Sequence, residues 1–248
     1  MQEIKCPKCG EVFQVDESGY AAIVRQVRDK EFEKELSERK AQYLSEKENA
    51  VLLAQTQTRQ ELAEEISRLQ EMMDEAKNIV FFGGAGVSTE SGIPDFRSVD
   101  GLYRQTYDFP PEKILSHSFY LKNKEEFYRF YHDKMLITDV EPNAAHRKLA
   151  ELERAGKLTA VVTQNIDGLH QKAGSSRVLE LHGSIHRNYC EKCGKFFDAE
   201  YMKAAPGVPH CDACGGDIKP DVVLYEEGLD SRILREAMEA VAGADMLI

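Results

Sequence analysis

The stretch that decides the fold runs Phe82-Gly83-Gly84-Ala85-Gly86-Val87-Ser88-Thr89-Glu90-Ser91-Gly92-Ile93-Pro94-Asp95-Phe96-Arg97. An apolar run of β type, Ile79 to Phe82, leads into this loop of small residues. Glycines let the backbone come close to a pyrophosphate, and the loop amides together with Ser88 can hold its oxygens. The order is not the GxGxxG dinucleotide fingerprint, because Thr89 stands where the third glycine would be.

The composition sets limits on function. The 248 residues suffice for one large or two medium domains. A net charge of -11 argues against nucleic acid as a partner, since phosphate binding needs a basic face. The sequence contains no apolar run that could span a bilayer and no signal peptide at its start, so we expect no membrane partner. All six cysteines fall in CxxC pairs, which indicates metal or redox chemistry in a cytoplasmic protein.

The chain divides into three regions by composition. Residues 1–16 hold a single cysteine knuckle, Cys6-Pro7-Lys8-Cys9. Residues 17–57 are predicted as a helical, coiled-coil extension, and residues 58–248 as the main domain. The helix is expected to continue from about Glu17 to Lys77, because this stretch has no proline and only one glycine.

Apolar residues give the predicted helix two seams. Leu62, Ile66 and Leu69 begin a series that alternates four and three apart, and Leu36 and Tyr43 belong to an earlier series with a spacing of seven. This pattern predicts a partner helix and a homo-oligomer. The alternative is a solvated charged helix that packs only at its ends.

Buried strands and helices alternate in the main domain. Strands are expected at Asn78–Phe82, Leu158–Thr163 and Val178–Leu181, with helices such as Lys124–Lys134 and Asn143–Ala155 between them. Such alternation predicts an α/β fold with a parallel sheet covered on both faces. Ligands of these sheets bind at the carboxyl ends of the strands, so the segments after Gly83 and Thr163 should share one crevice.

Polar groups follow the second of these strands in Gln164-Asn165-Ile166-Asp167-Gly168. Amide and carboxylate groups at a strand end suit hydrogen bonds to ribose hydroxyls and a carboxamide. Alternatively, Asn165 and Asp167 only cap the next helix.

A histidine follows the third strand directly, in Glu180-Leu181-His182-Gly183. Histidine titrates near neutrality and is a natural general base, while Gly183 leaves room for a ligand. Most of the seven histidines are expected to be structural; the position of His182 distinguishes it from the others.

Two cysteine pairs lie late in the chain. Cys190 and Cys193 form one CxxC, and Cys211 and Cys214 form the other. This spacing predicts a tetrahedral zinc site within a small module at about residues 186–220. Four thiolates leave no open position, so the zinc should be structural. Redox-active dithiols are the alternative.

Four motifs in this order resemble those of the sirtuins, NAD-dependent protein deacylases, from about Thr58 to Ile248. The resemblance implies a Rossmann-like sheet with an inserted zinc-ribbon module, and NAD and structural zinc as cofactors. It implies catalytic roles for Asn165 and for His182, the latter as the base. It also implies an NAD site formed by Gly84, Ala85, Gly86, Ser88, Thr89, Phe96, Arg97, Gln164, Ile166, Asp167 and His182.

The implied reaction transfers the acetyl group of a lysine to ADP-ribose with release of nicotinamide. Acetylated proteins or peptides are then the partners, and the segment Val222-Val223-Leu224-Tyr225 looks like the family's substrate strand. An extended peptide can add to such an edge through backbone hydrogen bonds. The alternatives are a module that binds NAD or ADP-ribose without catalysis, and an inactive remnant on a coiled-coil scaffold.

Three departures from the family pattern stand out. Tyr225-Glu226-Glu227 replaces the usual Phe-Gly-Glu, which puts the peptide preference in doubt. The sequence ends at Ile248 within an expected strand, so we expect the sirtuin portion to be C-terminally truncated. The N-terminal segment instead resembles the start of an uncharacterised bacterial coiled-coil family. There, Cys6 and Cys9 supply half a zinc site, which either a second chain completes or which is vestigial.

Overall fold

The structure is a computed structural model and describes residues 2–95, 101 and 108–248. The chain separates into two compact units, Met1–Glu71 and Met72–Ile248. Across the described residues, the search for a helix with the length and apolar character of a membrane span found no candidate.

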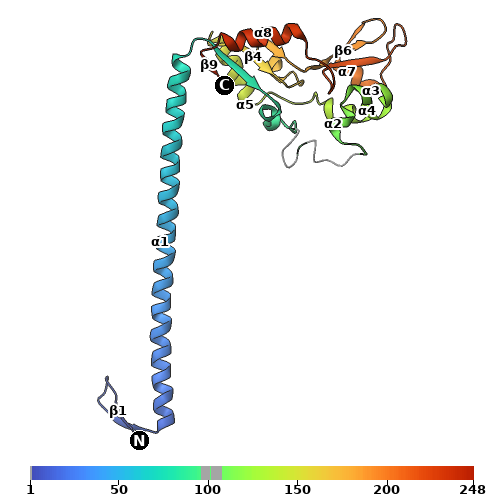
Figure 1. Ribbon diagram of the computed structural model, residues 1–248. Coiled ribbons are helices and arrows are strands. Elements are labelled where there is room, and N and C mark those ends of the chain that lie inside the picture. Colours follow the sequence, from blue (N-terminus) through green and yellow to red (C-terminus); the bar gives the residue numbers. More distant parts are fainter. Residues whose placement is uncertain (1, 96–100, 102–107) are drawn as a thin grey trace. The chain divides into compact units, whose positions relative to one another are not determined.

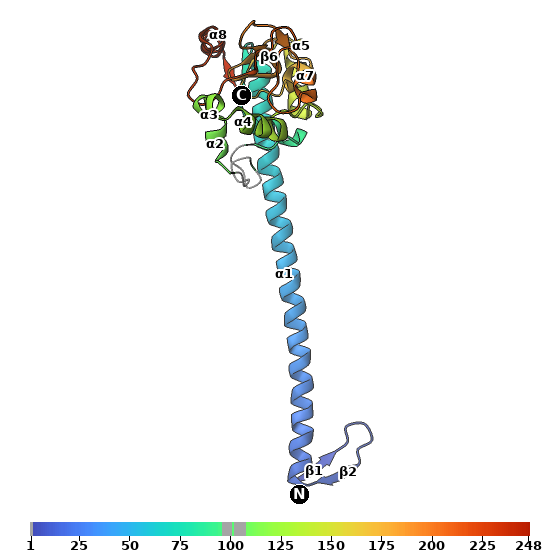
Figure 2. The same cartoon turned by 90° about the vertical axis from the view of Figure 1, so that its right-hand side faces the viewer.

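The first unit is a hairpin followed by a helix. Strands β1 (Gln2–Lys5) and β2 (Val12–Val15) pair antiparallel, and α1 (Glu17–Glu75) begins two residues after β2 (Figure 2). Asp16 caps this helix, because its carboxylate accepts from the N–H of Gly19 at 2.7 Å. The 59 residues of α1 are all described, and none is buried. The long helix predicted from composition is therefore confirmed, and its apolar side chains are left in water.

The second unit alternates helices and strands from residue 79 onward. Its elements are β3 (Ile79–Gly83), η1 (Ala85–Ser91), α2 (Pro111–Ile114), α3 (His117–Lys122), α4 (Lys124–Phe130), η3 (Tyr131–Met135), α5 (Ala144–Arg154), β4 (Leu158–Thr163), α6 (Leu169–Ala173), β5 (Val178–Glu180), β6 (Gly183–Cys190), β7 (Phe196–Phe197), α7 (Ala199–Ala204), β8 (Ile218–Val222), α8 (Ser231–Ala242) and β9 (Met246–Leu247).

A parallel sheet forms the larger part of this unit, in the order β5-β4-β3-β9. Helix α8 lies on one face and α5 on the other (Figure 1). The strands alternate their contacts accordingly. Val80 and Ala160 pack toward Ala237 of α8, whereas Ile79 and Val161 pack toward Leu149 of α5. Both faces are covered, which explains why the strands read as nearly continuous apolar runs.

A smaller lobe packs around a second sheet, with the antiparallel order β7-β6-β8. Its core joins these strands to α2, α3, α4, η3 and α7. Aromatic residues dominate it: Tyr120, Phe127, Tyr128 and Tyr131 are each at most 1% exposed. The inserted module predicted at about residues 186–220 lies in this lobe.

The sequence-based expectations hold for fold class, with small differences at element ends. The single helix expected at Lys124–Lys134 changes at Tyr131 from α4 to the π-type turn η3. Tyr128 and Tyr131 are in ring contact, and both are buried in the aromatic core. The wider π-type turn begins at Tyr131. The strand expected to reach Leu181 ends at Glu180.

Candidate functional site

The carboxyl ends of β3, β4 and β5 meet at one cavity of about 610 Å³. This is the edge of a parallel sheet at which ligands bind. Most of the predicted site residues line it: Ala85, Gly86, Ser88, Gln164, Asn165, Ile166, Asp167, His182, Val222, Val223, Leu224 and Tyr225. Predicted residues from four separate stretches of sequence are thus brought together in one place.

The loop after β3 and the segment after β4 are joined by three polar side chains. Ser88, which is fully buried, donates from Oγ to Oδ2 of Asp167 at 2.7 Å and accepts from Nδ2 of Asn165 at 2.9 Å. The other carboxylate oxygen of Asp167 caps α6 by accepting from the N–H of Leu169 at 2.9 Å. Asp167 therefore both caps α6 and lines the cavity. The helix-capping interpretation of the sequence and the ligand-binding interpretation are compatible.

His182 lies just after β5 with one ring nitrogen fixed. Its Nδ1 is 3.0 Å from the carbonyl oxygen of Gln164. A carbonyl only accepts, so Nδ1 carries the proton in the neutral ring and Nε2 keeps its lone pair. Since His182 lines the cavity, this is the tautomer that a base acting in the cavity needs.

Two predicted residues of the glycine loop lie beside the cavity without lining it. A Cβ on Gly84 would lie 3.4 Å from Oε1 of Gln164, which is close to ordinary van der Waals contact, so Gly84 stands directly beside a residue that lines the cavity. Thr89 is exposed, and its hydroxyl donates to the carbonyl of Gly86 at 2.9 Å. Phe96 and Arg97, which were also predicted, lie outside the described residues.

Gly183 follows His182 in a conformation that favours glycine, with φ of +78°. A Cβ at this position would lie 1.8 Å from the carbonyl oxygen of Asp221 in β8. Gly183 therefore allows β6 to pair with β8 immediately beside the histidine.

The expected substrate strand is partly β8 and partly the loop that follows it. Its backbone N–H groups are engaged within the protein: Val223 donates to the carbonyl of His182 at 3.0 Å, and Tyr225 donates to that of Leu115 at 3.0 Å. The N–H of Leu224 donates to Glu227 at 2.8 Å. These contacts fix the loop along one wall of the cavity.

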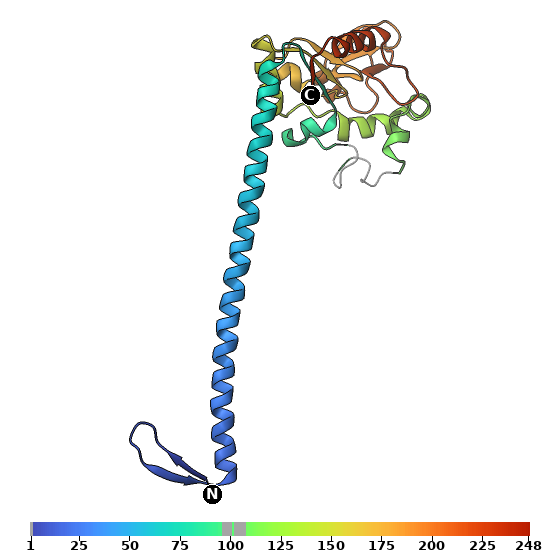
Figure 3. The same cartoon turned by 60° about the vertical axis from the view of Figure 1, so that its left-hand side comes forward.

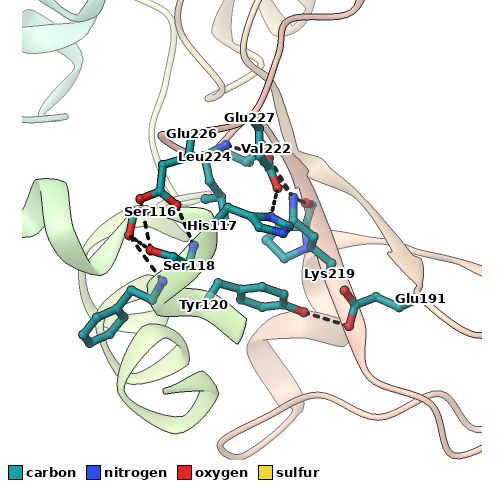
Figure 4. A network of polar contacts seen from close by, with 12 residues as sticks. Ser116, His117, Ser118, Tyr120, Glu191, Lys219, Val222, Leu224, Glu226 and Glu227 are labelled. Atoms are coloured by element: carbon teal, nitrogen blue, oxygen red, sulfur yellow. Dashed lines mark hydrogen bonds and ion pairs between the residues drawn. The ribbon is translucent and has the colours of Figure 1, made fainter. Parts of the chain in front are cut away.

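Two glutamates connect this loop to the start of α3 (Figure 4). Glu226 accepts from the N–H and Oγ of Ser118 at 2.8 and 3.0 Å. Among the described non-glycine residues, Glu226 alone has a positive φ, +76°. A glutamate in the left-handed region is strained, so the two bonds to Ser118 hold a conformation that the residue disfavours.

Glu227 contacts an imidazole ring and a lysine side chain besides the N–H of Leu224. Its carboxylate lies 2.7 Å from Nδ1 of His117 and 3.3 Å from Nζ of Lys219 (Figure 4). Partial burial alone would raise the pKa of Glu227. The Leu224 N–H, His117 and Lys219 outweigh that effect and lower the pKa, so this carboxylate stays ionised.

An arginine joins the two sheets near His182. Arg187 in β6 donates to Glu180 at the end of β5 at 2.6 Å and to Asp221 in β8 at 2.8 Å. Burial lowers the pKa of Arg187, but the two carboxylates outweigh it and raise the pKa. The pair fixes β5, and with it His182, against the strand that leads into the segment Val222–Tyr225.

The sequence reasoning missed several residues that line the cavity. Met135 and Ile137 reach it from η3 and the segment that follows, and Leu115 reaches it from the end of α2. Asp95 stands in the quoted loop and was not selected. The first three show no motif; only the packing of the small lobe brings them there.

The four late cysteines form a cluster of the kind that holds zinc. Their Sγ atoms all lie within 4.8 Å of one another, and the pairs Cys190–Cys214 and Cys193–Cys211 are 3.5 and 3.7 Å apart. A tetrahedron of sulfurs around zinc has edges of about 3.8 Å, so the donor set fits. Burial raises the pKa of Cys190, but the N–H groups of Cys193 and Lys192 outweigh it and lower the pKa to about 7. The N–H of Gly216 lowers the pKa of Cys214, but the thiols of Cys193 and Cys190 outweigh it and raise the pKa, so Cys190 ionises before Cys214.

Two buried histidines lie where α5 packs against α6. The rings of His146 (α5) and His170 (α6) have centroids 4.7 Å apart. Neither ring nitrogen of His170 has a hydrogen-bond partner among the described residues. Burial, with a smaller effect of His146, lowers the pKa of His170 to about 4, and burial also lowers that of His146. Both rings are therefore neutral at pH 7.

Comparisons with known proteins agree with this geometry. An NAD-dependent protein deacetylase of Clostridium acetobutylicum is 57% identical over 190 residues, which are 75% of this chain and 78% of that protein. A solved structure described as Sir2-p53 peptide-NAD+ is 38% identical, with a TM-score of 0.63 over 73% of this chain and 72% of the other. Another, a Sir2 bound to acetylated peptide, is 35% identical, with a TM-score of 0.63 over 73% of each chain. The Sir2 family model matches residues 84–248, and the chain belongs to the Sir2 family.

Proposed function

We propose that this chain is an NAD-dependent protein lysine deacetylase that transfers the acetyl group to ADP-ribose and releases nicotinamide. One observation carries the proposal. His182, with Nε2 free to accept a proton, lines the same cavity as Ser88, Asn165 and Asp167. Family membership and relatives named as deacetylases support it.

The residues around the cavity fit NAD. Gly84 and Gly86 leave the loop after β3 without side chains, and a Cβ on Gly86 would meet nothing within 4 Å. Asn165 and Asp167 offer an amide and a carboxylate, the groups that recognise ribose hydroxyls and a carboxamide. When bound, NAD supplies an ADP-ribosyl group that accepts the acetyl group as nicotinamide leaves. We assign the NAD site to the residues predicted from the sequence, including Thr89, Phe96 and Arg97.

His182 acts as the general base in this proposal. The carbonyl of Gln164 holds the proton on Nδ1, so Nε2 can take a proton from a hydroxyl in the cavity. The positive charge that then forms on the ring is stabilised by the same carbonyl. Ser88 orients Asn165 and Asp167, because its buried hydroxyl bonds to both. Orientation and exclusion of water are what such a site contributes to the rate.

The acetylated peptide is proposed to bind along the segment Val222–Tyr225. This segment forms a wall of the cavity, and Glu226 and Glu227 fix it to α3. Since the N–H groups of residues 223–225 are already engaged, a peptide strand would pair through the carbonyl of Val223. The zinc of the four-cysteine cluster serves structure, because the site is closed. Free thiols persist in the reducing cytoplasm, so we propose that the protein acts there.

The proposal is tested with an acetyl-lysine peptide and NAD. We expect nicotinamide release and deacetylated peptide from the wild-type chain. His182→Ala should lower kcat by at least about a hundredfold, while the Kd for NAD stays within about threefold, because a base acts in the chemical step. His210→Ala, on the zinc side of the molecule, is the matched control and should keep its activity. NAD binding without nicotinamide release by the wild type would favour a non-catalytic binding module instead.

A further inference from the structure

The N-terminal hairpin contains a turn that resembles the two turns of the zinc site. The sequence CxxCG occurs three times, in a first turn (Cys6–Gly10), a second turn (Cys190–Gly194) and a third turn (Cys211–Gly215). In each, the N–H of the first cysteine donates to the carbonyl five residues on, at 2.9, 2.9 and 2.8 Å. In each, the glycine N–H donates to the carbonyl of the first cysteine at 2.9 Å. The glycines have φ of +79°, +72° and +68°.

The first and second turns also present their sulfurs in the same way. The N–H groups of Lys8 and Cys9 bond to the sulfur of Cys6, as those of Lys192 and Cys193 bond to the sulfur of Cys190. Both turns connect two antiparallel strands, β1 to β2 and β6 to β7. The first turn therefore has the backbone of a metal-binding turn before any metal is bound.

The first turn differs in lacking a counterpart. The second and third turns supply two thiolates each and complete one another. Within the described part of the chain, no further cysteine, histidine or carboxylate joins Cys6 and Cys9 in a cluster of three or more. A closed thiolate site for zinc needs four ligands. A closed zinc site at the first turn would need two more ligands, which the described part of this chain does not bring to it.

The helix that follows the hairpin indicates where they come from. Tyr20, Val24 and Val27 are spaced four and three apart and are 39%, 48% and 51% exposed. Leu62, Ile66 and Leu69 repeat this spacing. Val27 and Leu62 are 35 residues apart, which is five heptads, so these two seams lie in one register. Leu36 and Tyr43 fall outside this register, and charged residues occupy several of its positions between the two seams, so pairing is proposed through the two end seams. An α1 with no buried side chain anywhere along its described length exposes this surface to water unless another helix covers it.

We propose that two copies of this chain pair through parallel α1 helices and share one zinc ion, bound by Cys6 and Cys9 of each copy. A two-fold axis along the paired helices presents identical seams to each other and brings the two first turns to the same end. The hairpin lies at the N-terminal end of α1, with its turn pointing away from the helix (Figure 3). An antiparallel pair would separate the two turns by the length of a 59-residue helix, about 89 Å.

Zinc stoichiometry of the full chain tests the proposal. The Cys190 cluster contributes one ion per chain and the shared site half an ion, so we expect one and a half zinc ions per wild-type chain. The double variant C6S/C9S should bind one. Lys8→Ser is the matched control, because it changes the same turn and keeps both sulfurs, and it should bind one and a half. One ion per wild-type chain, or two, would overturn the shared site.

Light scattering of the same proteins tests the pairing. The wild type should be a dimer, and C6S/C9S should dissociate at a protein concentration at least about tenfold higher. Val24→Glu with Val27→Glu, which places charges in the seam, should reduce both the dimer and the half-ion of zinc. Circular dichroism shows whether α1 stays helical in each variant. A monomeric wild type, or a dimer and zinc content that the seam variant leaves unchanged, would contradict the proposal.

Discussion

At the scale of single residues, Glu226 has a role that its exposed position conceals. It combines a strained backbone with two hydrogen bonds to Ser118, in the loop that borders the cavity. The usual sirtuin sequence has glycine at the position of Glu226, and glycine adopts a positive φ at little cost in energy. In this chain the Glu226 side chain therefore holds the loop through its hydrogen bonds to Ser118. A glycine would allow the same backbone conformation but could not form these bonds.

Two substitutions at Glu226 separate the strain from the contact. Glu226→Ala keeps the strained φ and loses both bonds, so it should lower the free energy of unfolding by about 1 kcal/mol. Glu226→Gly loses the bonds and relieves the strain, so it should stay within about 0.5 kcal/mol of the wild type. Urea denaturation at pH 7 measures both. Equal destabilisation by alanine and glycine would show that strain at this residue is not significant.

At the scale of secondary-structure elements, the contact of Arg187 with Glu180 and Asp221 joins β5 to β8 through β6. The Glu180 side chain is 8% exposed, so its carboxylate has little water to replace a lost partner. The Arg187 side chain is 39% exposed, so water screens its charge and reduces the free energy that its two ion pairs contribute to stability.

Arg187→Ala should lower the free energy of unfolding by about 1–2 kcal/mol and kcat/KM by about tenfold, because His182 follows the freed strand. Arg187→Lys keeps the charge but cannot reach both carboxylates with a planar fork, so it should fall between the alanine variant and the wild type. Thermal unfolding and steady-state kinetics measure the two effects. Wild-type kinetics in the alanine variant would mean that β5 is held by the sheet alone.

The contact between α5 and α6 predicts a dependence of stability on pH. The pKa of His170 is about 4 in the folded protein and near 6.5 when the chain is unfolded. The unfolded state therefore binds more protons between these values, and the free energy of unfolding falls as the pH drops from about 6.5 toward 4. The loss from this residue should approach about 3 kcal/mol at pH 4.

Urea denaturation of the wild type and of His170→Asn across this pH range tests that origin. The asparagine variant should lose the part of the slope that His170 contributes between pH 6.5 and 4, because it has no proton to bind there, while His146, whose pKa burial also lowers, keeps its share. His210→Gln, which removes a histidine whose side chain is 60% exposed, should keep the slope. An unchanged slope in His170→Asn would assign it to other groups.

At this scale, features set by local sequence were predictable, and features set by contacts between segments distant in sequence were not. Strands β3, β4 and β5 were predictable because their apolar runs end in glycine or polar residues, and the residues directly after them do line one cavity. The four-cysteine cluster was predictable from spacing alone. The φ of Glu226 and the reach of Met135 into the cavity were not, because both arise from α3 and η3 packing against a loop distant in sequence.

At the scale of the whole molecule, the chain keeps its candidate active site and its exposed helix in separate compact units. Every cavity-lining residue in the described chain lies at or beyond Ala85. The cysteine turn and both apolar seams used in the zinc argument lie before Met72. We therefore expect chemistry and self-association to be separable.

A chain that begins at Thr58 should keep kcat/KM for the acetylated peptide within about twofold of the full chain, because it retains every cavity residue. It should be monomeric and bind one zinc ion, because it lacks Cys6, Cys9 and most of α1. Kinetics, light scattering and zinc analysis on one preparation check all three. A large loss of kcat/KM with the fold intact would show that the first unit contributes to catalysis.

Gly183 is a position at which the structure restricts substitution. A single methyl group there would collide with the carbonyl of Asp221, and its φ of +78° excludes most side chains in any case. In a library of random variants, position 183 should accept one amino acid. Gly228, where a Cβ would meet nothing within 4 Å, should accept many. The residue directly after His182 is thus held by its close approach to β8, the strand that leads into Val222–Tyr225, so sequence changes along this contact must occur around Gly183.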